Sequence, residues 1–211
     1  MKKALLLVDL IKGFGQEGYD NNMYCKNSEG IRKNLQQLVD YANKNNMLVI
    51  YCCDAHEKED PELKENGGPW EEHCMKGTES SEIVDWLPSS GLVKLTGIDS
   101  NTAINQWILQ SDKNGNNNIF RIDKRTYSGF YNTVLDDFLK YNNVKEVYIA
   151  GLVTSICVQH TAADAFFRGY KVNIIENGCA DTSNEKHETA IEYMKNNYSA
   201  KAVRMNKNRL E

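Results

Sequence analysis

Short apolar runs alternate with helical patterns along the whole chain. The runs are four to seven residues long and mostly apolar, as expected for strands that are buried on both faces of a sheet; they lie at 4–8, 47–53, 119–122, 144–150, 171–175 and 200–203. Between the first two, apolar residues recur at helical spacing: Ile31, Leu35, Leu38, Val39 and Ala42. Weaker patterns predict helices at 81–86, 101–110, 133–141, 156–167 and 186–194.

This alternation predicts the fold class. Strands that alternate with helices form a parallel sheet covered on both faces, and 211 residues fit one domain with a single core. We therefore expect one doubly wound α/β domain over 1–211, with a mostly parallel sheet flanked by helices on both faces. In such sheets ligands bind beyond the carboxyl ends of the strands, where the strand order switches. Reactive residues at those ends become the candidates for function.

Charge and hydropathy exclude several classes of protein. The net charge is −4, so we expect no nucleic-acid partner, which would require a basic face. No run approaches the roughly 18 apolar residues that a membrane span needs, so we expect no membrane association. The apolar run near the N-terminus stops at Asp9, which fits a first strand better than a signal peptide. We expect a cytoplasmic protein.

The six cysteines indicate reduced thiols rather than a disulfide framework. They are few and irregularly spaced for a chain of this length, and they form no Cys-x-x-Cys pair. The adjacent Cys52 and Cys53 point to opposite faces of a strand and fit core positions. Any one of the six thiols could still be catalytic.

Four reactive residues lie at the predicted strand ends: Asp9, Asp54, Lys124 and Cys157. Cys157 opens a helix, and a helix N-terminus offers free N–H groups and positive dipole that favour thiolate and could stabilise an oxyanion. A lone cysteine there fits a buried core thiol better. Asp9 can take the proton of the thiol, and Lys124 can hold the two residues in place. With these two neighbours a catalytic role becomes more plausible than a core position, so we expect Cys157 to be a nucleophile.

His160 is an alternative base for Cys157. It lies three positions further along the same predicted helix and so on a similar face. A papain-like pair takes its histidine from a separate element, and we therefore favour Asp9.

Asp54, His56 and His73 form a candidate metal site. Asp54 and His56 are two residues apart at a strand end and point to the same side of the chain, and His73 follows after a polar loop. A carboxylate with two imidazoles suits zinc, iron or manganese. On its own this spacing is a weak signal.

Five segments together resemble the isochorismatase-like cysteine hydrolases and, within them, are most similar to the nicotinamidases. They are LLVD at 6–9 with Phe14, DAH at 54–56, HCMKGT at 73–78, DKRTYSGF at 123–130, and GLVTSICV at 151–158. The resemblance covers essentially the whole chain and keeps the order Asp, Lys, Cys. It implies that Asp9, Lys124 and Cys157 form a catalytic triad.

The resemblance also implies the other parts of the site. The backbone N–H groups of Val153 and Cys157 would form an oxyanion hole, beside a cis peptide at Leu152–Val153. The implied metal ligands are Asp54, His56, His73 and Glu62, with Glu65 as a contender for the fourth position. The implied wall that stacks on the substrate ring consists of Phe14, Trp70 and Tyr127.

The implied activity is that of a metal-dependent cysteine amidohydrolase that converts nicotinamide to nicotinate and ammonia. The resemblance also favours a homo-oligomer with a small amide as its substrate. Three alternatives stay open: a metal-free enzyme for a carbamoyl or ureido amide, an isochorismate hydrolase, and a non-catalytic protein that binds a metabolite.

Overall fold

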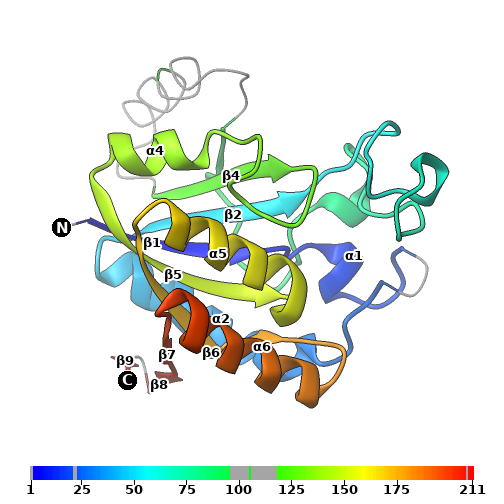
Figure 1. Ribbon diagram of the computed structural model, residues 1–211. Helices are drawn as coiled ribbons and strands as arrows, with labels where there is room; N and C mark the ends of the chain where they lie inside the picture. Colours follow the sequence, from blue (N-terminus) through cyan, green and yellow to red (C-terminus); the bar gives the residue numbers. More distant parts are fainter. Residues whose placement is uncertain (1, 21–22, 96–104, 106–117, 208) are drawn as a thin grey trace.

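The central sheet is entirely parallel and has seven strands. The computed structural model describes the chain apart from residues 1, 21–22, 96–104, 106–117 and 208 (Figure 1). The strand order is β3-β4-β2-β1-β5-β6-β7. The strands are β1 (Lys2–Val8), β2 (Leu48–Asp54), β3 (Val93–Lys94), β4 (Ile119–Lys124), β5 (Val144–Leu152), β6 (Lys171–Ala180) and β7 (Lys201–Val203).

Helices cover both faces of this sheet. In Figure 1, α4 (Leu135–Tyr141), α5 (Gln159–Phe167) and α6 (Asn184–Tyr198) lie in front, and α2 (Ser28–Lys44) lies behind. The doubly wound α/β prediction is therefore confirmed. In the described part of the chain, no helix is both long and apolar enough to cross a membrane.

The short elements lie at the edges of this framework. They are α1 (Lys12–Gly15), the 3₁₀ turns η1 (Lys64–Asn66) and η2 (Glu79–Ser81), the π-helical turn η3 (Thr154–Val158), and an antiparallel pair formed by β8 (Met205–Asn206) and β9 (Arg209–Leu210). The turn η3 runs directly into α5, so the predicted helix at 156–167 begins with a wider turn than expected.

The core forms where the sequence pattern places it. Leu5, Leu6 and Leu7 of β1 are fully buried, as is all of β2, including Cys52 and Cys53. The five apolar positions predicted for α2 are all buried against the sheet, which confirms its amphipathic face.

One predicted helix is absent from the structure, and one short strand was not predicted. The segment 81–86 is not a helix, because Ile83 bridges to Ile11 and Val84 N–H donates to the Leu10 carbonyl, so tertiary pairing replaces the helical hydrogen bonds. The short strand β3 was not predicted. The helix expected at 101–110 falls, apart from Asn105, outside the described residues.

The strand order reverses at β1, which pairs with β2 on one side and β5 on the other. Val8 is in register with Cys52 of β2 and with Gly151 of β5. The carboxyl ends of β1, β2 and β5 therefore meet at one point, and β4 brings Lys124 beside Asp54. This is the position at which a doubly wound sheet binds its ligand.

Gly151 allows β5 to approach β1 at this point. Its φ is +132°, and an added Cβ would lie 2.0 Å from the Val8 carbonyl oxygen. We expect Gly151→Ala to lower the free energy of unfolding by about 3 kcal/mol or more, because backbone atoms would have to move and alanine disfavours this φ. Urea denaturation would measure the change.

The matched control is Gly30→Ala in α2, where nothing lies within 4 Å of an added Cβ. This variant should be neutral or up to about 1 kcal/mol more stable. Equal stability of the Gly151→Ala variant and the unmodified protein would contradict the close approach.

Candidate active site

A fully buried lysine joins the ends of three strands. Lys124 Nζ lies 2.8 Å from Asp9 Oδ2 and 2.5 Å from Asp54 Oδ1, and it donates to the Thr126 carbonyl oxygen at 3.1 Å. The Asp54 N–H also donates to Asp9 Oδ1 at 2.8 Å. Burial lowers the pKa of Lys124, but Asp54 and Asp9 raise it more, so the net pKa is well above the usual value. The lysine is therefore charged.

Asp9 and Cys157 lie next to each other beside this lysine. One carboxylate oxygen each of Asp9 and Asp54 and the Cys157 sulfur all lie within 4.8 Å of one another. Burial and the Asp54 charge raise the pKa of Asp9 to about 7, against the opposing effect of Lys124. The structure thus brings together Asp9, Lys124 and Cys157, the three residues expected to form a triad.

The expected low pKa of Cys157 is wrong. The side chain lies in η3, as expected for a helix start, but burial raises the pKa of its thiol well above the ordinary value. Lys124 opposes this change, whereas the Asp9 and Asp54 charges add to it. The thiol is therefore protonated at neutral pH, and a carboxylate that can accept its proton lies next to it.

His160 does not join this group. It is exposed on α5, its Nδ1 donates to the Ile156 carbonyl oxygen at 2.8 Å, and its ring packs against Tyr127. The alternative Cys–His pair is therefore not formed.

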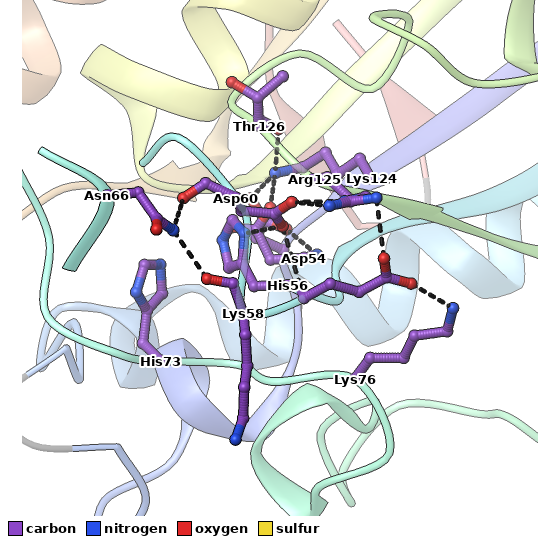
Figure 2. Close-up of polar contacts among 12 residues, drawn as sticks. Asp54, His56, Lys58, Asp60, Asn66, His73, Lys76, Lys124, Arg125 and Thr126 are labelled. Atoms are coloured by element: carbon purple, nitrogen blue, oxygen red, sulfur yellow. Dashed lines mark hydrogen bonds and ion pairs between the residues drawn. The ribbon is translucent and has the colours of Figure 1, made fainter. Parts of the chain in front are cut away.

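Asp54, His56 and His73 lie together, and Asp54 joins this group to Lys124. One ligand atom from each lies within 4.8 Å of the others, all three residues are buried, and the two imidazole rings are 4.7 Å apart (Figure 2). His73 Nδ1 donates to the Glu71 carbonyl oxygen at 2.7 Å, which leaves its Nε2 without a proton when the ring is neutral. Burial lowers the pKa of His73, which favours that neutral form.

The unpartnered atoms around this group fit a divalent cation. In the described residues, His56 Nε2 and Glu62 Oε1 are among the few buried side-chain atoms without a hydrogen-bond partner. Buried polar atoms rarely lack partners, and a cation held by Asp54, His56 and His73 would satisfy His56 Nε2. Glu62 does not belong to that compact group but lines the same pocket as Asp54 and His73. Glu65 lies exposed in η1, so Glu62 is the better candidate for a fourth ligand.

A single pocket of about 150 Å³ connects Cys157 with this group. Phe14, Trp70 and Tyr127 line it, as expected for a wall that stacks on a substrate ring, and Trp70 Nε1 donates to the Tyr127 hydroxyl at 2.9 Å. The remaining lining residues are Asp54, Glu62, His73, Met23, Tyr24, Leu152, Val153, Ile156, Cys157 and Thr182. The peptide Leu152–Val153 is cis, as expected.

Some residues at this site were not predicted. Met23, Tyr24, Ile156 and Thr182 line the pocket, and nothing in their spacing marks them. Asp60 contacts His56 at 3.0 Å. A histidine ligand needs an acceptor for its second nitrogen, so an acidic residue four positions from His56 was a usable signal.

A doubly wound sheet with a buried carboxylate, lysine and thiol at its switch point has the parts that hydrolysis by a cysteine nucleophile requires. The isochorismatase domain model matches residues 3–90 and 109–205. The chain belongs to the isochorismatase family and is a hydrolase of that family.

The proteins with similar sequences include nicotinamidases. A nicotinamidase of Escherichia coli (strain K12) is 24% identical over 91% of this chain and 89% of its own. A protein of Arabidopsis thaliana described as a probable inactive nicotinamidase is 29% identical over 92% and 88%.

Two solved structures share the fold across nearly their whole length. The pyrazinamidase of Pyrococcus horikoshii in complex with zinc has a TM-score of 0.76 at 26% identity, covering 97% of this chain and 99% of that one. The N-carbamoylsarcosine amidase of Thermoplasma acidophilum has a TM-score of 0.74 at 26% identity and covers 98% of each chain.

The metal site can be tested by its stoichiometry. We expect the unmodified protein to bind about one zinc, iron or manganese ion per chain and His73→Ala to lose most of it, because two of three buried ligands do not hold a divalent ion tightly. Elemental analysis after dialysis would measure both. Glu65→Gln, on the exposed 3₁₀ turn, is the control and should keep its metal. Full retention of the ion by His73→Ala would contradict the assignment.

Proposed function

We propose that this chain is a metal-dependent cysteine amidohydrolase, and that its substrate is nicotinamide. The observation that carries the proposal is the shared pocket, which is lined by Cys157 together with Asp54 and His73. The aromatic side chains that line the same pocket suit a small planar ring. The nicotinamidase and pyrazinamidase relatives support the same substrate class.

The chemistry begins with the thiol. Asp9 takes the Cys157 proton as the sulfur attacks the carboxamide carbon, which matches a raised pKa for both groups in the free protein. The backbone N–H groups of Val153 and Cys157 donate to the oxyanion. Asp9 then returns the proton to the departing nitrogen, releasing ammonia and leaving a thioester on Cys157. Water hydrolyses the thioester to nicotinate, with Asp9 as the base.

Lys124 keeps the carboxylates in place during these steps. Its ammonium bonds to both Asp9 and Asp54, so neither can turn away from the pocket. Asp54, His56, His73 and Glu62 would hold a divalent cation. When bound, such a cation supplies a positive charge that orients a ring nitrogen and makes nearby water more acidic.

A carbamoyl amino acid is a weaker candidate substrate. N-carbamoylsarcosine carries a carboxylate, and among the described residues that line the pocket there is no lysine or arginine to bind one. The pocket therefore favours an uncharged amide.

Loss of the nucleophile is the first test. Cys157→Ala should reduce ammonia release from nicotinamide by at least about 1,000-fold, because a nucleophile in a covalent mechanism has no substitute. Binding of nicotinamide, measured by calorimetry, should persist. Retained turnover in Cys157→Ala would contradict the role of Cys157. If the unmodified protein binds nicotinamide but releases no ammonia, it is a non-catalytic binder.

Substrate class and metal dependence can be separated in one assay. We expect ammonia release from nicotinamide and pyrazinamide, little from N-carbamoylsarcosine, and loss of activity after a chelator removes the metal, followed by recovery with zinc, iron or manganese. Faster release from N-carbamoylsarcosine than from nicotinamide, unaffected by the chelator, would instead indicate the metal-free carbamoyl amidase.

A further inference from the structure

A chain of ion pairs leads from the surface to the buried ring of His56. Lys76 pairs with Glu57 at 2.8 Å, Glu57 pairs with Arg125 at 2.9 Å, and Arg125 binds Asp60, with its Nε 2.5 Å from Asp60 Oδ1 (Figure 2). The Lys76 and Arg125 side chains are half exposed, whereas Asp60 is buried and its Oδ2 lies 3.0 Å from His56 Nδ1. Asp60 is not among the described residues that line the pocket.

Both oxygens of Asp60 act as acceptors. Oδ1 accepts from Arg125, and Oδ2 accepts from the Glu57 N–H at 3.0 Å. In this arrangement His56 Nδ1 is the donor to Oδ2. The proton on a neutral His56 therefore lies on Nδ1, and the lone pair lies on Nε2, the buried atom that has no partner and faces Asp54 Oδ2 at 3.7 Å.

The backbone around Asp60 is also held. The Asn66 amide donates to the carbonyl oxygens of Lys58, at 2.7 Å, and Asp60, at 2.8 Å, as Figure 2 shows. The Asp60 N–H donates to the Glu57 carbonyl oxygen at 3.0 Å. Asp60 is thus fixed at its backbone and its carboxylate before any ligand arrives.

We propose that Asp60, held by Arg125, is a positioning residue that fixes the tautomer and ring orientation of His56 and thereby sets the affinity of the chain for its divalent metal. The inference rests on the proposed metal site and goes beyond it, because it assigns a function to two residues that touch neither metal nor substrate. Removal of such a partner of a histidine ligand typically costs about 10–100-fold in metal affinity.

The test compares zinc affinity in four versions of the 211-residue chain by competition with a chromophoric chelator. Asp60→Asn should bind zinc about 10–100-fold more weakly than the unmodified protein. Arg125→Gln, at a half-exposed side chain, should shift affinity in the same direction by less. Asp164→Asn is the matched control, since that carboxylate is also held by an arginine, Arg168, and a hydroxyl, Ser128 Oγ, but among the described residues it forms no hydrogen bond or ion pair with a histidine. The zinc affinity of this variant should not change.

A structural defect would not give the same spectroscopic result. In the zinc-loaded protein, ¹H–¹⁵N spectra of the histidine rings should place the His56 proton on Nδ1, and Asp60→Asn should weaken or shift that signal while His73 keeps its own. Unchanged zinc affinity in Asp60→Asn overturns the proposal, and if that variant does not fold, unchanged affinity in Arg125→Gln overturns it. An unmodified protein that binds no zinc, iron or manganese overturns the proposed metal site as well, and the two failures are thereby distinguished.

Discussion

The pairing of one buried ammonium with two buried carboxylates is the constraint on which the site depends. Lys124 is fully buried, and an unpaired ion in the interior costs several kcal/mol. Asp9 and Asp54 compensate it, but the group still carries a net negative charge. That charge has two consequences. Together with burial, which is the larger cause, it raises the pKa of Asp9 to about 7 and that of Cys157 well above its usual range, and it favours a further positive charge beside Asp54.

The two halves of the site are therefore linked through Lys124. On one side, a protonated thiol lies beside a carboxylate that can accept its proton. On the other, Asp54 faces two imidazoles whose second nitrogens are already bonded, His73 to a carbonyl oxygen and His56 to Asp60. The strand register Asp54 to Lys124, at the switch point beside β1, holds both halves at a fixed separation.

Much of the fold follows from periodicity, and the rest depends on contacts that the sequence does not display. The strands at 4–8 and 144–150 were predictable as buried apolar runs, although β1 begins two residues earlier, at Lys2, and β5 ends two residues later, at Leu152. The helix expected at 81–86 fails because Ile83 and Val84 pair with the chain near Leu10 instead. The order Asp9, Lys124, Cys157 could be predicted from the sequence motifs. Whether the pKa of Cys157 is raised or lowered could not, because it depends on how deeply the thiol is buried. The Asp60–Arg125 pair joins residues 65 positions apart, and its role depends on geometry alone. The single-domain, oligomeric and cytoplasmic assignments stay predictions.

A crystal structure of the zinc-loaded Cys157→Ala variant with nicotinamide would test the central claim most directly. The account predicts one zinc ion held by Asp54, His56 and His73, and a nicotinamide ring between Phe14 and Trp70. The carboxamide carbon should lie where a Cys157 sulfur would be about 3–3.5 Å away, the distance of a productive attack. Zinc at other residues, or nicotinamide bound with its carboxamide turned away from position 157, would contradict it.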